Sequence, residues 1–299
     1  MERIKQALEL ARQERQKHGG NSVHPKGNSF FKKFQGVADQ EITYTNTRSI
    51  RFNERELREK RIIVDQQSSI SDAYRLLRTQ ILQRLNEKGW NTLMVTSPSS
   101  GEGKTLTAIN LAISLAREVD YTVLLVDANL RSPRLNDYFG FTSELGLSDY
   151  LTNDVNLSDI LVHPEGIPKF VILPAGRPLS NSSEMLSSPK MNRLVDDLKH
   201  RYPSRIVLFD LPPLLECSDA LAFGPNVDAS LIVVEEGKTQ EQSLRQAFEL
   251  MGNNEVIGTV LNKAYTRDRD YTSLDVKQGI LSKLLTRISQ FKLSSKTRA

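Results

Sequence analysis

The segment from Ser97 to Thr105, with the sequence SPSSGEGKT, constrains the fold of this 299-residue chain more than any other stretch. It follows a short apolar run, TLMVTS at 92–97, and leads into GKTLTAINLAISLARE at 103–118, where apolar residues have helical spacing. A loop between a strand and a helix N-terminus presents backbone N–H groups and the positive end of the helix dipole to an anion. The segment therefore predicts a strand–loop–helix unit that binds phosphate groups.

Individual residues of this loop suit a nucleoside triphosphate. Glycine at 101 and 103 lets the backbone approach the phosphates without a Cβ in the way. Lys104 is expected to reach the β- and γ-phosphate oxygens, and Thr105 to offer its hydroxyl to Mg²⁺. The usual pattern has glycine six positions before the lysine, where this chain has Pro98. We expect ATP and Mg²⁺ to bind at Ser100, Gly101, Glu102, Gly103, Lys104, Thr105 and Leu106.

Apolar runs and helical patterns alternate along the middle of the chain. The apolar runs are rich in Val, Ile and Leu without polar alternation, which indicates strands buried on both faces. Helices fit between them near 184–201, 218–224 and 239–252. The pattern predicts an α/β fold of the P-loop NTPase type, with helices on both faces of a doubly wound, mostly parallel sheet. The further expected strands are 122–128, 170–175, 205–211, 229–236 and 256–262.

Two aspartates stand at the ends of expected strands, Asp127 in LLVDANLRSP and Asp210 in VLFDLPP. In a doubly wound sheet the carboxyl ends of the strands line the ligand crevice, so both carboxylates are expected beside the phosphate loop. Asp210 is the expected Mg²⁺ ligand, directly or through water. Asp127 is expected to be a second ligand or the base that orients an attacking hydroxyl. Either aspartate could instead be a helix cap just past its strand.

Together these motifs resemble the Walker A, Walker A′ and Walker B set of the bacterial tyrosine kinases. The resemblance is closest to the stand-alone autokinases encoded with exopolysaccharide and exosortase loci, covers about residues 62–262, and includes a deviant Walker A loop. It implies ATP-dependent tyrosine autophosphorylation, a ring-shaped homo-oligomer, and a membrane-embedded polysaccharide chain-length or co-polymerase protein as partner.

The resemblance extends to two other sites. Asp72, Arg75 and Arg78 match the family's Glu-x-x-Arg-x-x-Arg helix with Asp in place of Glu, which implies subunit contacts; a solvated helix face is the alternative. Asn262 lies where the family meets the nucleotide base, and its amide could read an adenine edge or simply form a turn.

The implied phosphoryl transfer uses Lys104, Asp127, Arg131 and Asp210 as its catalytic residues. Lys104 and Arg131 would offset charge on the γ-phosphoryl group, although Arg131 could instead pair structurally with an acidic residue. The implied phosphoacceptors are Tyr265 and Tyr271, the only tyrosines after Lys263; ordinary surface tyrosines are the alternative.

One departure from the family keeps a second function open. Asn129 replaces the second aspartate of the family's Walker A′ motif and removes a charge from the site. With so few tail tyrosines, a nucleotide-dependent scaffold ATPase without kinase activity remains an alternative. A membrane-cycling ATPase of the partitioning type is another, but Ser99 stands where that class has a second lysine.

Charge and hydropathy divide the chain into four parts: an amphipathic helix at 1–17, a basic polar linker at 18–61, the ATPase domain at 62–264, and a tail at 265–299 with a basic amphipathic helix at 279–291. Residues 1–64 and 263–299 each carry a net charge of +6, so the middle carries −8. Basic ends suit an anionic membrane surface or an acidic partner; solvated tails are the alternative.

These features predict where the protein works. No apolar run approaches the ~20 residues of a membrane span, and the single cysteine, Cys217, suits a reducing compartment. We expect a cytoplasmic protein at the inner face of the cell membrane, with peripheral membrane contact and no nucleic-acid partner.

Overall fold

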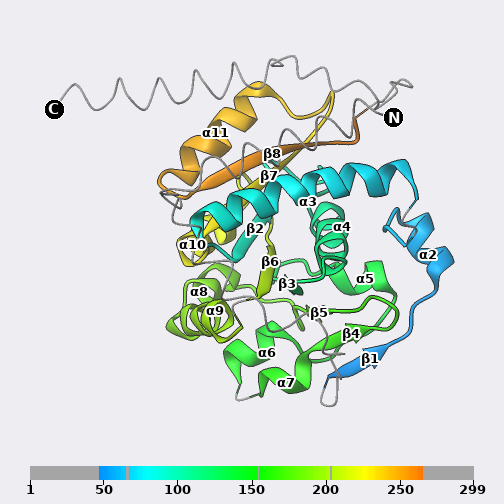
Figure 1. Ribbon diagram of the computed structural model, residues 1–299. Helices are drawn as coiled ribbons and strands as arrows, with labels where there is room; N and C mark the ends of the chain where they lie inside the picture. The colour runs from blue at the N-terminus through cyan, green and yellow to red at the C-terminus, as the bar shows by residue number, and fades with distance from the viewer. Residues whose placement is uncertain (1–46, 65–66, 154, 203, 265–299) are drawn as a thin grey trace, which may run out of the picture. The chain divides into compact units, whose positions relative to one another are not determined.

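The computed structural model describes residues 47–64, 67–153, 155–202 and 204–264 (Figure 1). The described helices and strands all lie within the compact unit Met1–Asn262. The strands are β1 (Arg48–Ile50), β2 (Thr92–Thr96), β3 (Thr122–Asp127), β4 (Val162–Pro164), β5 (Phe170–Leu173), β6 (Arg205–Asp210), β7 (Ala229–Glu235) and β8 (Val256–Asn262). The helices are α2 (Glu54–Glu59), α3 (Ser69–Lys88), α4 (Lys104–Ala116), α5 (Leu135–Phe139), α6 (Leu147–Thr152), α7 (Leu157–Ile160), α8 (Ser182–Leu186), α9 (Pro189–Arg201), α10 (Asp219–Phe223), the 3-10 turn η2 (Gly224–Asn226) and α11 (Glu241–Met251).

The strands form one sheet in the order β1-β4-β5-β3-β6-β2-β7-β8. All neighbouring pairs are parallel except β4 and β5, which run antiparallel. The phosphate-loop strand β2 lies between β6 and β7, so the ends of the central strands meet beside the loop. The predicted mostly parallel, doubly wound sheet is confirmed.

Helices cover both faces of this sheet, and the alternation of strand side chains divides the core in two. Leu93 and Val95 of β2 pack with α3 and α4 on one face. Met94, between them in sequence, packs with α9 and α11 on the other. Eleven of the thirteen residues of α4 are buried, which explains the long apolar run after the phosphate loop.

The prediction that residues 18–61 form a linker was wrong for the last part of that range. β1 extends the sheet by pairing with β4, and α2 follows it with Asn53 as its N-cap. Ile50 and Leu57 are buried in the core. The charge run of α2 hid this helix, because Leu57 is its one buried residue and its charged side chains form the solvated face.

Other predicted boundaries also need correction. The helix expected at 184–201 is two helices, α8 and α9, because Ser188 caps a new helix that begins at Pro189. The amphipathic segments at 1–17 and 279–291 lie outside the described residues, as do Tyr265 and Tyr271.

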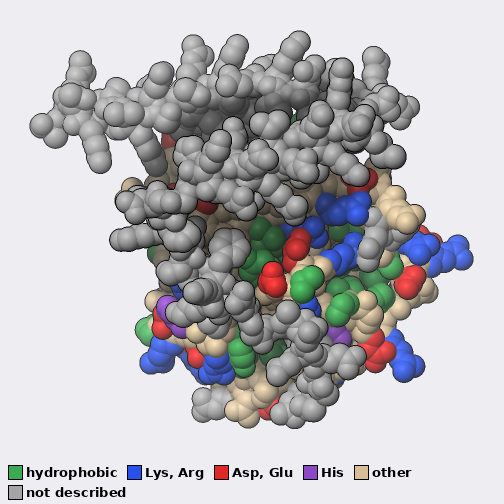
Figure 2. Space-filling view, viewed as in Figure 1, with side chains coloured by type: hydrophobic (Ala, Val, Ile, Leu, Met, Phe, Trp, Pro, Cys, Tyr) green, Lys and Arg blue, Asp and Glu red, His purple; other side chains and the backbone are tan. Residues whose placement is uncertain are grey.

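On the face seen in Figure 2, Lys and Arg side chains are interspersed with Asp and Glu. Of the helices described, none combines the length and the apolar character that a membrane span requires.

Candidate nucleotide-binding site

The phosphate loop joins β2 to α4, and glycine is required at Gly103. This residue is the N-cap of α4 with φ of +90°, a left-handed conformation that favours glycine. A Cβ at this position would lie 2.0 Å from Nδ2 of Asn262. The same Nδ2 donates a 2.8 Å hydrogen bond to the carbonyl of Glu102. Asn262, at the end of β8, therefore packs directly against the phosphate loop.

Glu102 ties the loop to the turn after β7. Its side chain is buried, and Oε2 accepts a 3.0 Å hydrogen bond from the N–H of Ser99. Oε1 accepts a 2.5 Å hydrogen bond from the hydroxyl of Thr239. The carboxylate is thus held in place and supports the loop. Only the main chain of Glu102 is therefore available to bind a phosphate group.

Asp127 and Asp210 lie side by side at the ends of β3 and β6, as direct neighbours in the sheet register. Both are almost fully buried, with 1% of each residue exposed. The hydroxyl of Thr105 donates a 2.7 Å hydrogen bond to Oδ2 of Asp210. The predicted grouping of Thr105, Asp127 and Asp210 is therefore observed.

The two carboxylates differ in their hydrogen bonds. Oδ1 of Asp127 accepts the N–H of Asn129 at 3.2 Å, and Oδ2 accepts the N–H of Leu135 at 3.1 Å. Asp127 therefore also binds main-chain N–H groups after its strand, including that of the first residue of α5, although the N-cap residue of that helix is Arg134 and not the aspartate that the helix-cap alternative expected. Among the described residues, Oδ1 of buried Asp210 has no hydrogen-bond partner. That oxygen is open to a cation or a water molecule.

Burial raises the pKa values of both carboxyl groups. Desolvation raises the pKa of Asp127 to about 7, and the charge of Asp210 adds to the rise. Desolvation also raises the pKa of Asp210, whereas the Lys104 ammonium and the Thr105 hydroxyl oppose that rise. Two adjacent buried carboxylates without a cation are unfavourable when both are ionised, so the site suits a bound positive charge.

The donor set fits Mg²⁺. This ion is usually held by one or two carboxylates, with phosphate oxygens and waters completing its octahedron. Thr105 and Asp210 would hold it, with Asp127 beside them. Over the described parts of the chain there is no cluster of three or more His, Cys, Asp or Glu residues able to enclose a metal ion.

Arg131 has an acidic partner. Its Nη2 lies 3.8 Å from Oδ1 of Asp219, which is fully buried at the start of α10. Within the described chain, no N–H or O–H group donates a hydrogen bond to either carboxylate oxygen of Asp219. The alternative reading of Arg131, as the partner of an acidic residue, is thus supported, although the guanidinium side chain is still 55% exposed.

The predicted subunit-contact residues do not form one exposed ridge on α3. Asp72 and Arg75 are exposed and pair with each other. Arg78 is mostly buried; it donates to the carbonyl of Ser114 at 3.0 Å and pairs with Glu118 at 2.7 Å. Arg78 therefore links α3 to the end of α4 within the same subunit.

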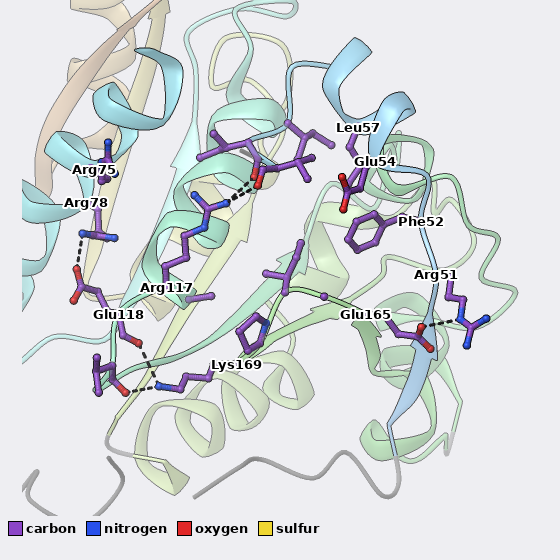
Figure 3. A pocket seen from close by; sticks show the side chains of 18 residues that line it. Arg51, Phe52, Glu54, Leu57, Arg75, Arg78, Arg117, Glu118, Glu165 and Lys169 are labelled. Carbon is purple, nitrogen blue, oxygen red and sulfur yellow. Dashed lines mark hydrogen bonds and ion pairs between the residues drawn. The ribbon is translucent and has the colours of Figure 1, made fainter. Parts of the chain in front are cut away.

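Arg75 and Arg78 also line a cavity of about 810 Å³, shown in Figure 3, in which Arg78 pairs with Glu118 and Arg51 with Glu165. The cavity lies by residues 116–119, at the opposite end of α4 from Lys104. A thirteen-residue helix is about 20 Å long, so this cavity is separate from the phosphate loop.

Sequence reasoning missed two acidic residues that reach the site region, Glu216 and Asp219. Glu216 accepts a hydrogen bond from the N–H of Ser100 in the phosphate loop. Both residues follow β6 in the stretch LPPLLECSD, where polar residues interrupt an apolar segment. That interruption could have indicated that Glu216 and Asp219 lie near the site, but it did not indicate which residues they contact.

Comparisons with known proteins agree with this geometry. The CobQ/CobB/MinD/ParA nucleotide binding domain family (CbiA) matches residues 93–277. The tyrosine-protein kinase YwqD of Bacillus subtilis is 30% identical over 216 residues, which are 71% of this chain and 90% of YwqD. The succinoglycan biosynthesis transport protein ExoP of Rhizobium meliloti is 32% identical over 209 residues, 68% of this chain but only 26% of ExoP. The solved kinase domain of the Escherichia coli tyrosine kinase ETK is 29% identical with a TM-score of 0.64, covering 71% of this chain and 82% of that domain.

The fold and the site define a P-loop nucleotide-binding protein of the CobQ/CobB/MinD/ParA type. Within that class, the chain belongs to the bacterial tyrosine kinases.

Proposed function

We propose that this chain is an ATP-dependent protein-tyrosine autokinase that regulates exopolysaccharide biosynthesis and export. The observation that carries the proposal is the hydrogen bond from Thr105 to Asp210, which lies beside Asp127, at the end of a phosphate loop. The chain that contains it is related to tyrosine kinases. The relationship to ExoP supports the link to polysaccharide.

Each residue of the site has a task in phosphoryl transfer. Lys104 and the main-chain N–H groups of the loop bind the phosphates of ATP. Thr105 and Asp210 would hold Mg²⁺, which would supply positive charge to neutralise the phosphates. Asp127 accepts or orients the proton of the attacking tyrosine hydroxyl. Arg131, whose guanidinium is partly exposed, offsets negative charge on the transferred group.

The proposed acceptors are Tyr265 and Tyr271, supplied by a neighbouring subunit of a homo-oligomer. A phosphotyrosine adds about −1.5 to −2 charges at neutral pH. That added charge would weaken contacts between the tail and an acidic site, so phosphorylation would favour release of the tail and disassembly of the oligomer.

The proposed setting is the inner face of the cell membrane. A membrane-embedded polysaccharide co-polymerase is the proposed partner, and the basic ends of the chain, each with a net charge of +6, would favour an anionic surface.

Phosphate mapping tests the kinase proposal. Purified protein is incubated with Mg²⁺ and ATP, and modified tyrosines are located by mass spectrometry. We expect phosphotyrosine at 265 or 271 that is lost in Lys104→Ala and retained in the matched control Lys88→Ala, since Lys88 lies in the last turn of α3. The double variant Tyr265→Phe/Tyr271→Phe should lose the signal while still binding ATP.

Asn129 favours a second candidate function. Its side-chain carbonyl accepts the N–H of Ser132 at 3.3 Å, so it supports the turn after β3 and adds no charge to the site. A scaffold ATPase of the exopolysaccharide machinery would need the nucleotide site without tyrosine transfer. ATP hydrolysis without phosphotyrosine in the same experiment would favour the scaffold and overturn the kinase.

A further inference from the structure

A carboxylate from outside the phosphate loop is bound to one of the loop's N–H groups. Oε1 of Glu216 accepts a 2.6 Å hydrogen bond from the N–H of Ser100, although the two residues are 116 positions apart in sequence. Ser100 belongs to the stretch expected to bind the phosphates. An N–H group that binds one anion is not available to a second in the same position, so this contact competes with a nucleotide.

The backbone places Glu216 there. After β6 the chain runs beside the phosphate loop: the N–H of Leu214 donates to the carbonyl of Ser97 at 2.9 Å, and that of Leu215 to the carbonyl of Pro98 at 3.1 Å. These two main-chain bonds bring the next residue to Ser100. The contact therefore follows from the path of the chain, and the side chain of Glu216 needs only to turn toward the loop.

Comparison with Glu102 shows which carboxylate can leave the loop. Glu102 is buried and accepts two hydrogen bonds, so removing it would leave the N–H of Ser99 and the hydroxyl of Thr239 without their acceptor. Glu216 is exposed and has one such bond to the loop, and water can solvate it after it moves. Glu216 is the exchangeable anion.

We propose that Glu216 is a built-in competitor of the nucleotide: its carboxylate accepts the N–H of Ser100 in the phosphate loop and must leave it before a nucleoside triphosphate binds fully. This inference rests on the proposed nucleotide site and adds a determinant of its affinity. Glu216 weakens binding both by using the N–H and by repelling the phosphates, and the repulsion is greater for ATP than for ADP because ATP carries more negative charge.

The test compares Glu216→Gln and Glu216→Ala with the wild type. Dissociation constants for Mg·ATP and Mg·ADP are measured by calorimetry at low and high salt, with Glu87→Gln as the matched control. Glu87 is an exposed acid in the last turn of α3, which leads to the start of β2, whereas the phosphate loop follows the end of β2. Glu87→Gln removes the same charge at a position away from the phosphate loop.

We expect Glu216→Gln to bind ATP about three- to tenfold more tightly than the wild type, with a smaller gain for ADP. The Glu216→Ala variant lacks the hydrogen-bond acceptor as well as the charge, so it should bind ATP at least as tightly as Glu216→Gln. The gain should shrink at high salt because exposed charges are screened, and Glu87→Gln should match the wild type.

Two outcomes overturn the inference. Unchanged ATP affinity in both variants would show that Glu216 does not compete, and weaker affinity would show that it supports the bound state. With either outcome, ATP binding by the wild type would still support the proposed nucleotide site. A wild type that binds no ATP would instead overturn the proposed function itself.

Discussion

The hydroxyl of Thr105, in the first turn of α4, donates a 2.7 Å hydrogen bond to the carboxylate of Asp210 at the end of β6. The two residues are 105 positions apart in the sequence. Their contact connects the phosphate loop to the neighbouring strand, and within the described chain the other carboxylate oxygen of Asp210 accepts no hydrogen bond. That oxygen and the Thr105 hydroxyl are the donor atoms of the proposed Mg²⁺ site.

The variant Asp210→Asn should lose most of its Mg²⁺-dependent ATP affinity. The amide keeps the shape of the side chain but removes the charge that a hard cation requires. We expect binding of Mg·ATP to weaken at least about tenfold, or by about 1.4 kcal/mol, with little change when EDTA is present. Calorimetry with and without Mg²⁺ measures both values. Asp196→Asn, an exposed aspartate on α9, is the matched control; equal Mg²⁺ dependence in the two variants would contradict the metal site.

Stability of the metal-free protein should fall as pH rises from about 4 to about 7. The folded-state pKa of Asp127 is raised to about 7 from its ordinary value of 3.8, mainly by burial. The folded state therefore holds the proton more tightly than the unfolded state, and this contribution to stability is lost as the carboxyl ionises. Urea unfolding in EDTA at pH 5 and pH 8 measures the change.

The same measurement on Asp127→Asn isolates the contribution of this carboxyl. We expect its free energy of unfolding to fall less between the two pH values, by on the order of 1 kcal/mol or more. Identical pH dependence in the wild type and the variant would show that Asp127 titrates normally in the folded protein.

Asp219→Asn should lower the phosphorylation rate without lowering stability. Removing the charge that faces Arg131 releases the guanidinium, so we expect kcat to fall about tenfold with little change in the KM for ATP. A buried carboxylate is costly to the fold, and among the described residues no N–H or O–H group donates to Asp219, so Tm should stay constant or rise. The double variant with Arg131→Ala should be no slower than Arg131→Ala alone. A lower Tm with unchanged kcat would instead assign Asp219 a structural task.

Leu57→Ala should destabilise the protein by about 2–4 kcal/mol, because it opens a cavity beneath α2. Leu57 is 1% exposed, whereas Leu76 on α3 is 55% exposed and serves as the matched control. Denaturant unfolding measures both variants. A loss no greater than that of Leu76→Ala would show that residues 48–60 contribute little to the core.

The central strands could be predicted because both of their faces are buried, which makes each a continuous run of apolar residues. β1 and β4 could not, since three residues such as RSI and VHP are too short to show a pattern. In the site, the motifs and the position of each aspartate at the carboxyl end of a strand predicted that Asp127 and Asp210 would lie beside the phosphate loop. The contact between Glu216 and Ser100 could not be predicted, because it depends on the path of the chain after β6, which leaves no periodic signal.

Calorimetric titration of the purified chain with ATP in the presence of Mg²⁺ measures whether Lys104 and the metal together hold the nucleotide. We expect saturable one-to-one binding that weakens at least about tenfold when Lys104 is replaced by alanine or when Mg²⁺ is removed, and that is unchanged in Lys88→Ala. A wild type that releases no heat of binding, or a Lys104→Ala variant with wild-type affinity, would contradict this expectation.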